Sequence, residues 1–448
     1  MSKLHQAMKW EQLLSPARFG KSFQEGLETD VFRSEFQRDF DRIIFSSPFR
    51  RLQNKTQVFP LPGSVFVHNR LTHSLEVASV GRSLGNRVAS SLLKKNPRNP
   101  LLFEIGSIVA AASLAHDLGN PPFGHSGENA ISGYFISGSG TALKDRVTDT
   151  QWNDLTHFEG NANALRLLTH AFSGRRKGGY VLTYATLASL VKYPFGSDNR
   201  TSKNKYGFFD TEKELFADIA HKTGLINDPN NEAVYFRHPL VFLVEAADDI
   251  SYQIMDVEDA HKLGILTTEK TIELLTNFFK DPEDSRFWEK MASVFKEVTD
   301  KNEQIAFLRA SVINLLVQKI SDIFHLHEKE ILLGQLNGSL IDQLTGAPKL
   351  AMETCKTLAW KEIYNHPSVV KIEITGYQVL NTLLGEFIPA MLHKPNSYSK
   401  KLLSLLPVQY QENHQTDYEK IRSVLDFVSG MTDLYALDQY KLIKGIGI

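Results

Sequence analysis

Two histidines and two aspartates lie at helical spacing from apolar residues. They are His73 in NRLTHSLEV, His116 and Asp117 in AHDLGNPPFGHSGE, and Asp248 in VEAADDISYQIMD. His73 lies four residues before Val77, and Asp248 continues the apolar steps that precede it on its own segment. Steps of three and four residues fall on one face of a helix, so these polar groups are expected to point inward. An unpaired charge there would be very costly.

A divalent cation would allow two imidazoles and two carboxylates to converge between helices. Nitrogen and oxygen ligands without thiolate suit Mg, Mn, Fe, Co, Ni or Zn and do not choose among them. Such a site lowers the pKa of bound water and neutralises phosphate charge. Taken singly, a histidine on an apolar stripe is more often a hydrogen-bonded core residue, and the pair Asp248-Asp249 more often a cap. Their joint occurrence on helical stripes favours the metal site.

Helical periodicity dominates the chain and predicts the elements that would carry these residues. Helices are expected over Leu71–Lys95, over Leu101–Leu118, from near Pro239 past Tyr252, and over 267–280, 303–330, 351–363, 376–392 and 416–428. Strand signals are few and short, as near Val369–Ile374. The stretch 173–235, rich in Gly, Lys, Asn and Asp, is expected to be a polar insertion with loops.

These patterns predict an all-α fold with one main body. Residues 46–270 would form the helical core, residues 1–45 an N-terminal segment packed on it, and residues 271–448 a C-terminal helical region that completes the same body.

The composition bounds the function classes. The chain has 50 Lys and Arg against 51 Asp and Glu, so an anionic substrate needs a local cationic pocket. Cys355 is the only cysteine, which excludes an intramolecular disulfide and a multi-cysteine metal site and fits a reducing cytoplasm. The longest apolar stretch, around SIVAAASLA, is far shorter than the about 20 residues of a membrane span. There is no GxxxxGK[ST] phosphate loop and no HExxH motif. A cytoplasmic protein without a membrane partner is expected.

The four metal-binding candidates resemble the ligands of the HD superfamily of metal-dependent phosphohydrolases. Longer motifs resemble the bacterial dGTP triphosphohydrolase family: FRSEFQRDFDRIIFSSPFRRLQNKTQVF, RLTHSLEV, HDLGNPPFGHSGE, HFEGNAN, LVKYPF and EAADDISY, between residues 33 and 256. The resemblance implies that His73, His116, Asp117 and Asp248 bind the metal, with Mg or Mn favoured and Co, Ni, Fe or Zn as alternatives. It favours Asp248 over Asp249, because the family's ligand precedes a tyrosine by four residues and Tyr252 fits.

The same resemblance implies two catalytic groups, His125 and Glu128. In the family the equivalent residues assist hydrolysis at the α-phosphorus, and a neutral histidine oriented by a carboxylate suits proton transfer. Whether His125 activates water or protonates the departing 5′ oxygen stays open. Alternatively, Glu128 caps the following helix, with Ser126 as a candidate N-cap, and both roles can coexist.

A triphosphate carries about four negative charges and needs cationic groups around it. Arg70 lies one helical turn before His73 and so can reach phosphate beside the metal. The resemblance implies further substrate contacts: Lys192 and Tyr193 with the phosphates, Tyr252 and Asp256 with the sugar and phosphate region, Gln57 with the 3′ hydroxyl, Val58 against C2′, and His157 in the pocket.

The expected reaction converts dGTP and water to deoxyguanosine and triphosphate, although the base preference rests on resemblance alone. One alternative is another HD phosphohydrolase, acting on nucleoside monophosphates or cyclic nucleotides. Another is a non-catalytic regulator that binds nucleotides or single strands, but the basic and aromatic stripes of a strand-binding groove are missing. Related enzymes are commonly homo-oligomers, including hexamers, so a homo-oligomer is expected.

Overall fold

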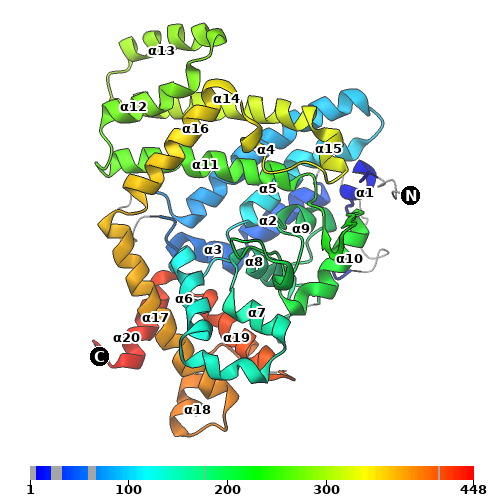
Figure 1. Cartoon of the computed structure of the whole chain (residues 1–448), viewed down its shortest axis with the longest axis vertical. Coiled ribbons are helices and arrows are strands. Elements are labelled where there is room, and N and C mark those ends of the chain that lie inside the picture. Colours follow the sequence, from blue (N-terminus) through cyan, green and yellow to red (C-terminus); the bar gives the residue numbers. More distant parts are fainter. Residues whose placement is uncertain (1–6, 22–32, 59–66, 176, 412–413, 448) are drawn as a thin grey trace.

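The computed structural model describes residues 7–21, 33–58, 67–175, 177–411 and 414–447 (Figure 1). In these ranges the chain is mainly α-helical, which confirms the predicted fold class, and the one sheet is a short antiparallel pair. None of the helices in the described ranges combines the length and apolar character needed to cross a membrane.

The α-helices of one or more turns are distributed along the whole described chain. They are α1 (Trp10–Leu13), α2 (Glu35–Ile44), α3 (Ser47–Arg51), α4 (Arg70–Lys95), α5 (Ile105–Ala115), α6 (Gly124–Ile136), α7 (Asp149–Thr156), α8 (Gly160–Thr169), α9 (Tyr184–Leu190), α10 (Lys213–Thr223), α11 (Val241–Lys262), α12 (Thr268–Thr276), α13 (Ser285–Glu297), α14 (Lys301–Leu326), α15 (Glu328–Leu332), α16 (Gly346–Leu358), α17 (Pro367–Leu392), α18 (Ser397–Leu403), α19 (Asp417–Ser429) and α20 (Asp433–Lys444). The strands are β1 (Asn227–Asp228) and β2 (Asn231–Tyr235).

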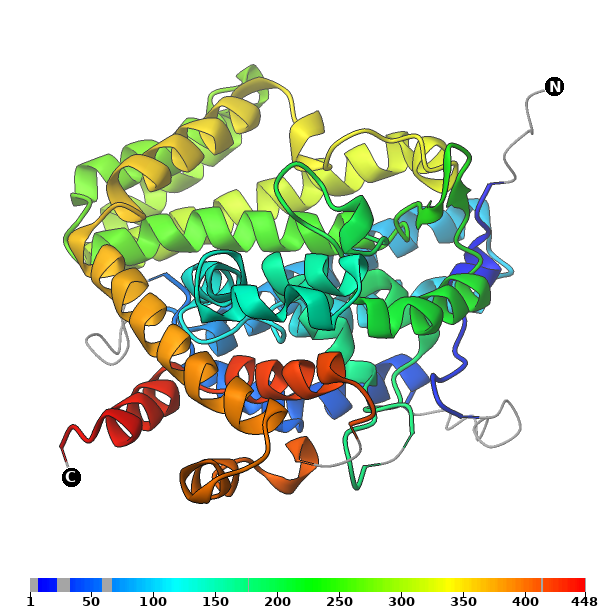
Figure 2. The ribbon, with the colours of Figure 1, turned by 60° about the horizontal axis from the view of Figure 1, so that its bottom comes forward.

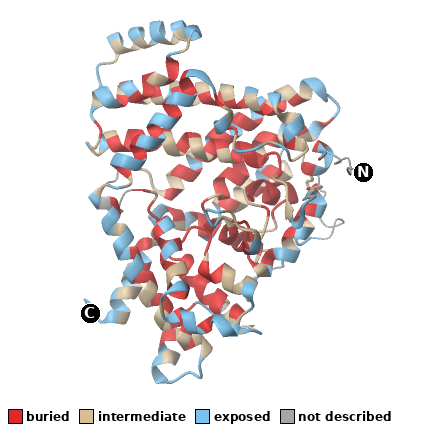
Figure 3. Ribbon diagram, viewed as in Figure 1, coloured by how far each residue is buried: buried red, intermediate tan, exposed pale blue. Residues whose placement is uncertain are grey.

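Helices α4, α5 and α11 form the centre of the molecule, with α14 packed on α4 and α11. Helix α4 begins where the Asn69 side chain accepts the backbone N–H of Thr72 at 3.0 Å, and its apolar stripe is fully buried. Helix α5 consists largely of small apolar residues, so its neighbours approach it from several sides. The buried residues concentrate on these central helices (Figure 3).

The C-terminal helices pack on the opposite side from α14 (Figure 2). Helix α17 contacts α6, α19 and α20. The predicted strand at Val369–Ile374 is wrong, because these residues lie in α17. Their alternating β-branched residues favour a strand locally, but Val369 is buried against the core and the segment continues the apolar stripe of 376–392. Tertiary packing has overridden local propensity.

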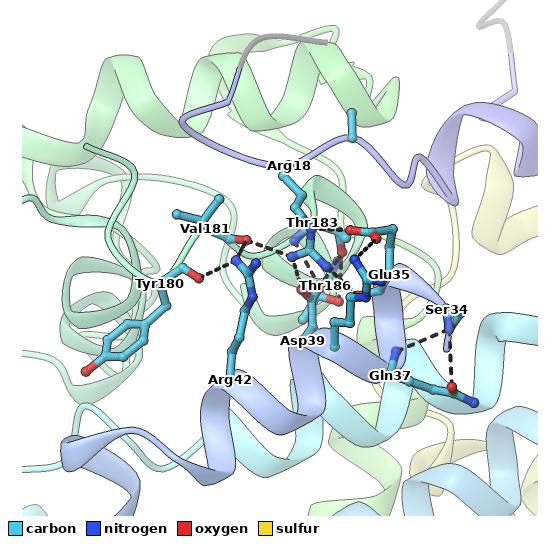
Figure 4. Close-up of polar contacts among 12 residues, drawn as sticks. Arg18, Ser34, Glu35, Gln37, Asp39, Arg42, Tyr180, Val181, Thr183 and Thr186 are labelled. Atoms are coloured by element: carbon cyan, nitrogen blue, oxygen red, sulfur yellow. Dashed lines mark hydrogen bonds and ion pairs between the residues drawn. The ribbon is translucent and has the colours of Figure 1, made fainter. Parts of the chain in front are cut away.

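A buried polar cluster joins the N-terminal residues to the segment before α9 (Figure 4). Asp39 on α2 accepts Arg18 Nη1 at 2.6 Å, and its other oxygen accepts the backbone N–H and the hydroxyl of Thr183 at 2.9 and 2.6 Å. Arg42 donates to the carbonyl oxygen of Val181 at 2.6 Å. Burial raises the pKa of the Asp39 carboxyl. The stretch 173–235 is therefore anchored to the body, and it contains the helices α9 and α10 as well as the predicted loops.

His238 makes a second connection between distant segments just before α11. Its Nε2 donates to the carbonyl oxygen of Leu13 at 3.1 Å, and its Nδ1 accepts the N–H of Leu240 at 3.2 Å. The imidazole is fully buried, and burial lowers its pKa to about 4. The neutral ring is therefore the form that the fold requires.

Candidate active site

The structure brings together the four residues predicted to bind a metal. His73 comes from α4, His116 caps the C-terminal end of α5 with Asp117 in the following turn, and Asp248 comes from α11. Asp248 Oδ1 lies 3.1 Å from His73 Nε2 and 3.4 Å from His116 Nε2. The nitrogen His116 Nε2 lies 3.6 Å from Asp117 Oδ1. The helical stripes thus converge at one point between α4, α5 and α11.

The donor set fits a divalent cation. One potential ligand atom from each of His73, His116 and Asp117 lies within 4.8 Å of the others. His116 Nδ1 donates to the Ser113 carbonyl oxygen at 2.6 Å, which leaves Nε2 facing the cluster. Imidazole nitrogens with carboxylate oxygens suit Mg, Mn, Fe, Co, Ni or Zn, so the donors alone do not identify the ion.

Neighbouring side chains hold Asp117 in its charged form. Its Oδ2 accepts Arg70 Nη1 at 2.7 Å, and its Oδ1 accepts Asn120 Nδ2 at 2.5 Å. Burial acts to raise the pKa of Asp117, but Arg70 and His116 lower it to about 2. Burial likewise acts to lower the pKa of His116, but Asp117 and Asp248 raise it to about 9. The carboxylates are thus balanced by Arg70 and by a proton on the His116 imidazole, and a bound cation would take the place of that proton.

Two glycines permit the close contact between the turn after α5 and the start of α8. A Cβ atom on Gly119 would lie 2.0 Å from the carbonyl oxygen of Gly160. A Cβ atom on Gly160 would lie 2.2 Å from Asn120 Oδ1. A side chain at either position would force the two segments apart. The glycines of HDLGN and HFEGN therefore set the distance between the candidate metal-binding residues and α8.

His125 and Glu128 lie in the first turns of α6 and contact each other. Glu128 Oε2 lies 2.8 Å from His125 Nδ1, and Glu128 Oε1 accepts the backbone N–H of Gly160 at 2.8 Å. The hydrogen bond to Glu128 raises the pKa of His125. The carboxylate is buried while the imidazole is 76% exposed, so His125 Nε2 is the nitrogen available to a substrate.

The alternative capping role predicted for this segment is wrong in its details. Helix α6 begins at Gly124, and its N-cap is Phe123, so Ser126 lies inside the first turn and does not cap it. Phe123 has the left-handed φ of 64°, which is uncommon for a residue with a side chain. Glu128 instead accepts the backbone N–H of Gly160, the first residue of α8, whose N-cap is Glu159.

A cavity of about 230 Å³ lies beside the candidate metal-binding residues. Seven predicted site residues line it: His116, Asp117, His125, Glu128, Lys192, Tyr193 and Asp248. Residues that were not predicted also line it, among them Asn120, Glu159, Asn161, Lys205 and Glu245. Both lysines pair with acidic neighbours. Lys192 Nζ lies 3.0 Å from Glu245 Oε1, and Lys205 Nζ lies 2.7 Å from Glu159 Oε2.

Lys205 is the most important of the residues that the sequence analysis missed. Its Nζ also lies 3.6 Å from Glu128 Oε2, so it connects the His125–Glu128 pair to Glu159. The motifs HFEGNAN and HDLGNPP already contained Glu159, Asn161 and Asn120, but no spacing pattern pointed to Lys205.

Other predicted substrate residues lie outside the lining of this cavity. Arg70 is buried and pairs with Asp117, the metal-ligand candidate. His157 lies at the end of α7, where its Nδ1 contacts the carbonyl oxygen of Asn153 at 3.1 Å. Gln57 has a buried Oε1 without a hydrogen-bond partner among the described residues, and the neighbouring Val58 is buried.

Tyr252 and Asp256 extend the site along α11. The Tyr252 ring lies 6.3 Å from the ring of His73 and stacks 5.8 Å from the ring of Tyr364. The Tyr364 hydroxyl donates to Asp256 at 2.6 Å, and burial raises the pKa of Asp256 to about 7. Tyr364, from the region between α16 and α17, was not predicted because no motif marked that part of the chain.

Comparisons with known proteins identify the class to which this fold and site belong. The HD domain family matches residues 70–161, which include three of the four clustered residues. The phosphohydrolase-associated domain family matches residues 344–442. The chain is thus an HD-domain phosphohydrolase.

Full-length relatives narrow the class. A Synechocystis sp. deoxyguanosinetriphosphate triphosphohydrolase-like protein is 40% identical over 98% of this chain and 100% of its own length. A Pseudomonas aeruginosa protein with the same description is 37% identical over 98% and 99%. A Yersinia enterocolitica deoxyguanosinetriphosphate triphosphohydrolase is 30% identical over 96% and 98%. The chain belongs to the deoxyguanosinetriphosphate triphosphohydrolase family, as its motifs predicted.

Proposed function

We propose that the chain is a metal-dependent hydrolase that converts deoxynucleoside triphosphates, with dGTP favoured, to deoxynucleoside and inorganic triphosphate. The observation that carries this proposal is the joint placement of the His73–His116–Asp117–Asp248 cluster and the His125–Glu128 pair at one cavity that two lysines line. The relatives named as dGTP triphosphohydrolases support the substrate.

In this proposal His73, His116, Asp117 and Asp248 hold a divalent ion, with Mg or Mn favoured. When bound, the ion supplies a Lewis acid that lowers the pKa of water and neutralises phosphate charge. Asp117 keeps its orientation through Arg70 and Asn120. Arg70 thereby supports the cluster, and we propose that its guanidinium also faces the phosphates.

His125 and Glu128 move the proton in the proposed reaction. Water attacks the α-phosphorus in line, the bond from that phosphorus to the 5′ oxygen breaks, and the triphosphate leaves with the α-phosphorus. The 5′ oxygen takes a proton and departs on the deoxynucleoside. Glu128 fixes His125 Nδ1, so Nε2 either accepts the proton of the water or supplies the proton of the 5′ oxygen.

Lys192, Tyr193 and Lys205 provide the phosphate contacts. Lys192 and Lys205 are paired with glutamates, so a triphosphate would compete with Glu245 and Glu159 for them. At about 230 Å³ the cavity lies below the about 300–1,000 Å³ of typical small-molecule sites, which suits the phosphate end of a nucleotide. We propose that the sugar and base of the nucleotide contact the other predicted residues: Tyr252, Asp256, Gln57, Val58 and His157.

A nucleotide panel tests the proposal. Purified protein is incubated with each dNTP and rNTP and with Mg or Mn, and the products are separated by ion-exchange chromatography. The expected products are deoxynucleoside and intact triphosphate, lost in a folded His116→Ala, Asp117→Ala double variant. Release of pyrophosphate or orthophosphate instead, or turnover of nucleoside monophosphates or cyclic nucleotides alone, would reject the proposal.

We also propose that the chain forms a homo-oligomer. Large apolar side chains are exposed on the helical segments from α16 to α17, including Leu350, Trp360 and Ile374. Exposed apolar surface of this kind is typical of protein interfaces. Light scattering after size-exclusion chromatography measures the state, and a monomer at micromolar concentration would contradict it. The division into an N-terminal segment, a core at 46–270 and a C-terminal region stays a prediction.

A further inference from the structure

The Asp433 carboxylate connects the end of the chain to two segments near the candidate active site. Asp433 is the first residue of α20 and is 6% exposed. Its Oδ2 accepts the backbone N–H of Thr56 at 2.9 Å, and its Oδ1 accepts the backbone N–H of Phe123 at 3.0 Å. These partners lie 377 and 310 residues away in the sequence. One carboxylate therefore holds two segments that have no sequence proximity.

Capping of α20 does not account for Asp433. The N-cap is Thr432, whose hydroxyl accepts the backbone N–H of Tyr435 at 3.2 Å. Both oxygens of Asp433 are instead used by other parts of the chain. The buried donors need such an acceptor, since a buried N–H without a partner is strongly unfavourable.

Each of the two segments carries a residue with a proposed role. Phe123, in its left-handed conformation, immediately precedes the turn of α6 that carries His125. Thr56 immediately precedes Gln57 and Val58, the proposed sugar contacts. A residue that fixes both backbones fixes the spacing between the reacting end of the site and its sugar end.

Contacts around Asp433 brace the same segments. Lys55 Nζ donates to the carbonyl oxygens of Asn120 at 2.5 Å and Ser429 at 2.9 Å. Asn163 Nδ2 donates to the hydroxyl of Ser429 at 3.2 Å. Asn163 Nδ2 also donates to the carbonyl oxygen of Gly119 at 2.8 Å, so Lys55 and Asn163 both link the corner between α19 and α20 to the turn that follows Asp117.

We propose that Asp433 is a positioning residue that fixes the placement of His125 relative to the sugar-reading residues Gln57 and Val58. This inference rests on the proposed function, because the roles of those three residues come from it. It adds that hydrolysis and the preference for deoxyribose depend on one carboxylate in the C-terminal region.

The Asp433→Asn variant tests the inference with little change in volume. The amide keeps one acceptor oxygen, but its NH₂ group faces a donor at the other N–H. Displacement of reacting groups by about 1 Å costs up to roughly 100-fold in rate. The kcat/KM for dNTP should be lower by roughly 10- to 100-fold. The ratio of kcat/KM for dNTP to kcat/KM for rNTP should also be smaller than in wild type. The Asp433→Glu variant keeps both carboxylate oxygens, so it should recover part of the kcat/KM for dNTP and part of the dNTP-to-rNTP ratio.

Asp281→Asn is the matched control. Asp281 Oδ1 accepts the backbone N–H of Ala347 at 2.9 Å across 66 residues, and neither residue lines the candidate site. The substitution removes the carboxylate charge beside Lys319, whose Nζ lies 4.0 Å from Asp281 Oδ2, and should lower the melting temperature without changing kcat/KM or the ratio. If Asp433→Asn behaves like this control, with both kinetic quantities within two-fold of wild type, Asp433 is only a structural residue and the inference is overturned.

Hydrogen exchange separates this inference from the proposed function. In Asp433→Asn at least one of the Thr56 and Phe123 amides should exchange faster, while in Asp281→Asn both should exchange as in wild type. If the wild-type chain releases no triphosphate, the proposed function fails on its own. The inference is then rejected if the exchange of the Thr56 and Phe123 amides is unchanged, and its holding role is retained if at least one of them is faster.

Discussion

Replacing Glu128 by glutamine tests the proposed proton-transfer pair most directly. The carboxylate is buried, contacts His125 Nδ1 at 2.8 Å and accepts the Gly160 N–H at 2.8 Å. Glutamine keeps the volume and can still accept the N–H of Gly160 with its oxygen. Its NH₂ group then faces His125 Nδ1, so the imidazole must place its lone pair on Nδ1 and its proton on Nε2. His125 would then have no lone pair on Nε2 to act as a base, and its doubly protonated form, which an acid requires, would be disfavoured.

The magnitude of the effect follows from this change of tautomer. A positioned general acid or base contributes typically about 10²- to 10⁴-fold to a rate. A carboxylate that fixes the tautomer of a catalytic histidine carries up to about 10⁴-fold of this. The kcat of Glu128→Gln should therefore fall by about 10²- to 10⁴-fold. The KM should change little, because Lys192 and Tyr193 are unaffected and Lys205 keeps its closer partner Glu159, whose Oε2 lies 2.7 Å from Lys205 Nζ.

The pH profile of the variant shows which role His125 plays. The bond to Glu128 raises the pKa of His125, so in the variant that pKa falls. If His125 acts as a base, activity requires its neutral form, and the acidic limb of kcat/KM moves to lower pH. If it acts as an acid, activity requires the protonated form, and the alkaline limb moves to lower pH.

Triphosphate release at saturating metal and over a range of dNTP concentrations, measured from pH 5 to 9, is the assay, because it gives both kcat and kcat/KM. Glu258→Gln is the control, because Glu258 is also buried and paired, with Lys262 at 2.8 Å and Arg309 at 2.5 Å, but does not line the cavity. A kcat within three-fold of wild type for Glu128→Gln, with unchanged limbs, would refute the reasoning.

Three further predictions concern phosphate binding, the metal and stability. Lys192→Met should raise the KM for dNTP by roughly 10-fold, because it removes a charged donor to the phosphates. Glu245 stays paired in this variant, because Arg237 Nη1 lies 2.8 Å from its Oε2. An unchanged KM in steady-state kinetics would contradict this prediction. Asp248→Asn should weaken Mn²⁺ binding at least roughly 10-fold by calorimetry, and chelation of wild type should abolish triphosphate release until Mn²⁺ is returned; wild-type affinity in the variant would reject this ligand. The pKa of His238 is lowered to about 4 in the fold, so its contribution is complete above its ordinary pKa of 6.5 and is lost as the pH falls toward 4. Between pH 7 and pH 4.5 the free energy of unfolding in urea should fall by up to about 3 kcal/mol more in wild type than in His238→Gln. An equal fall in the two proteins would contradict this prediction.

The sequence predicted those parts of the site that lie on regular helices. His73, His116 and Asp248 could be found because each continues an apolar stripe, and a stripe determines which way a side chain faces. The neighbouring helices α4, α5 and α11 were predicted for the same reason. The order His, His-Asp, Asp then made the resemblance specific, and the comparisons confirm the family.

The sequence could not predict the parts of the site set by irregular backbone and distant contacts. Lys205 lies in a loop between α9 and α10, where no periodicity relates it to Glu128. Tyr364 and Asp433 reach the site across 108 and more than 300 residues, and pattern analysis does not detect such pairs. Local alternation at Val369–Ile374 predicted a strand, but these residues lie in α17. The prediction failed because the burial of that segment depends on helices elsewhere in the chain.

The contacts of Lys55 and Asp433 have a consequence for synthesis on the ribosome. Lys55 and Thr56 are made long before their partners, because Ser429 lies 374 residues after Lys55 and Asp433 lies 377 residues after Thr56. A nascent chain can form α4 and α5 from local sequence, yet it lacks these contacts to the turn before His125 until residues 429 and 433 have been made. Chains that stop before residue 429 would lack this bracing and would therefore be poor catalysts.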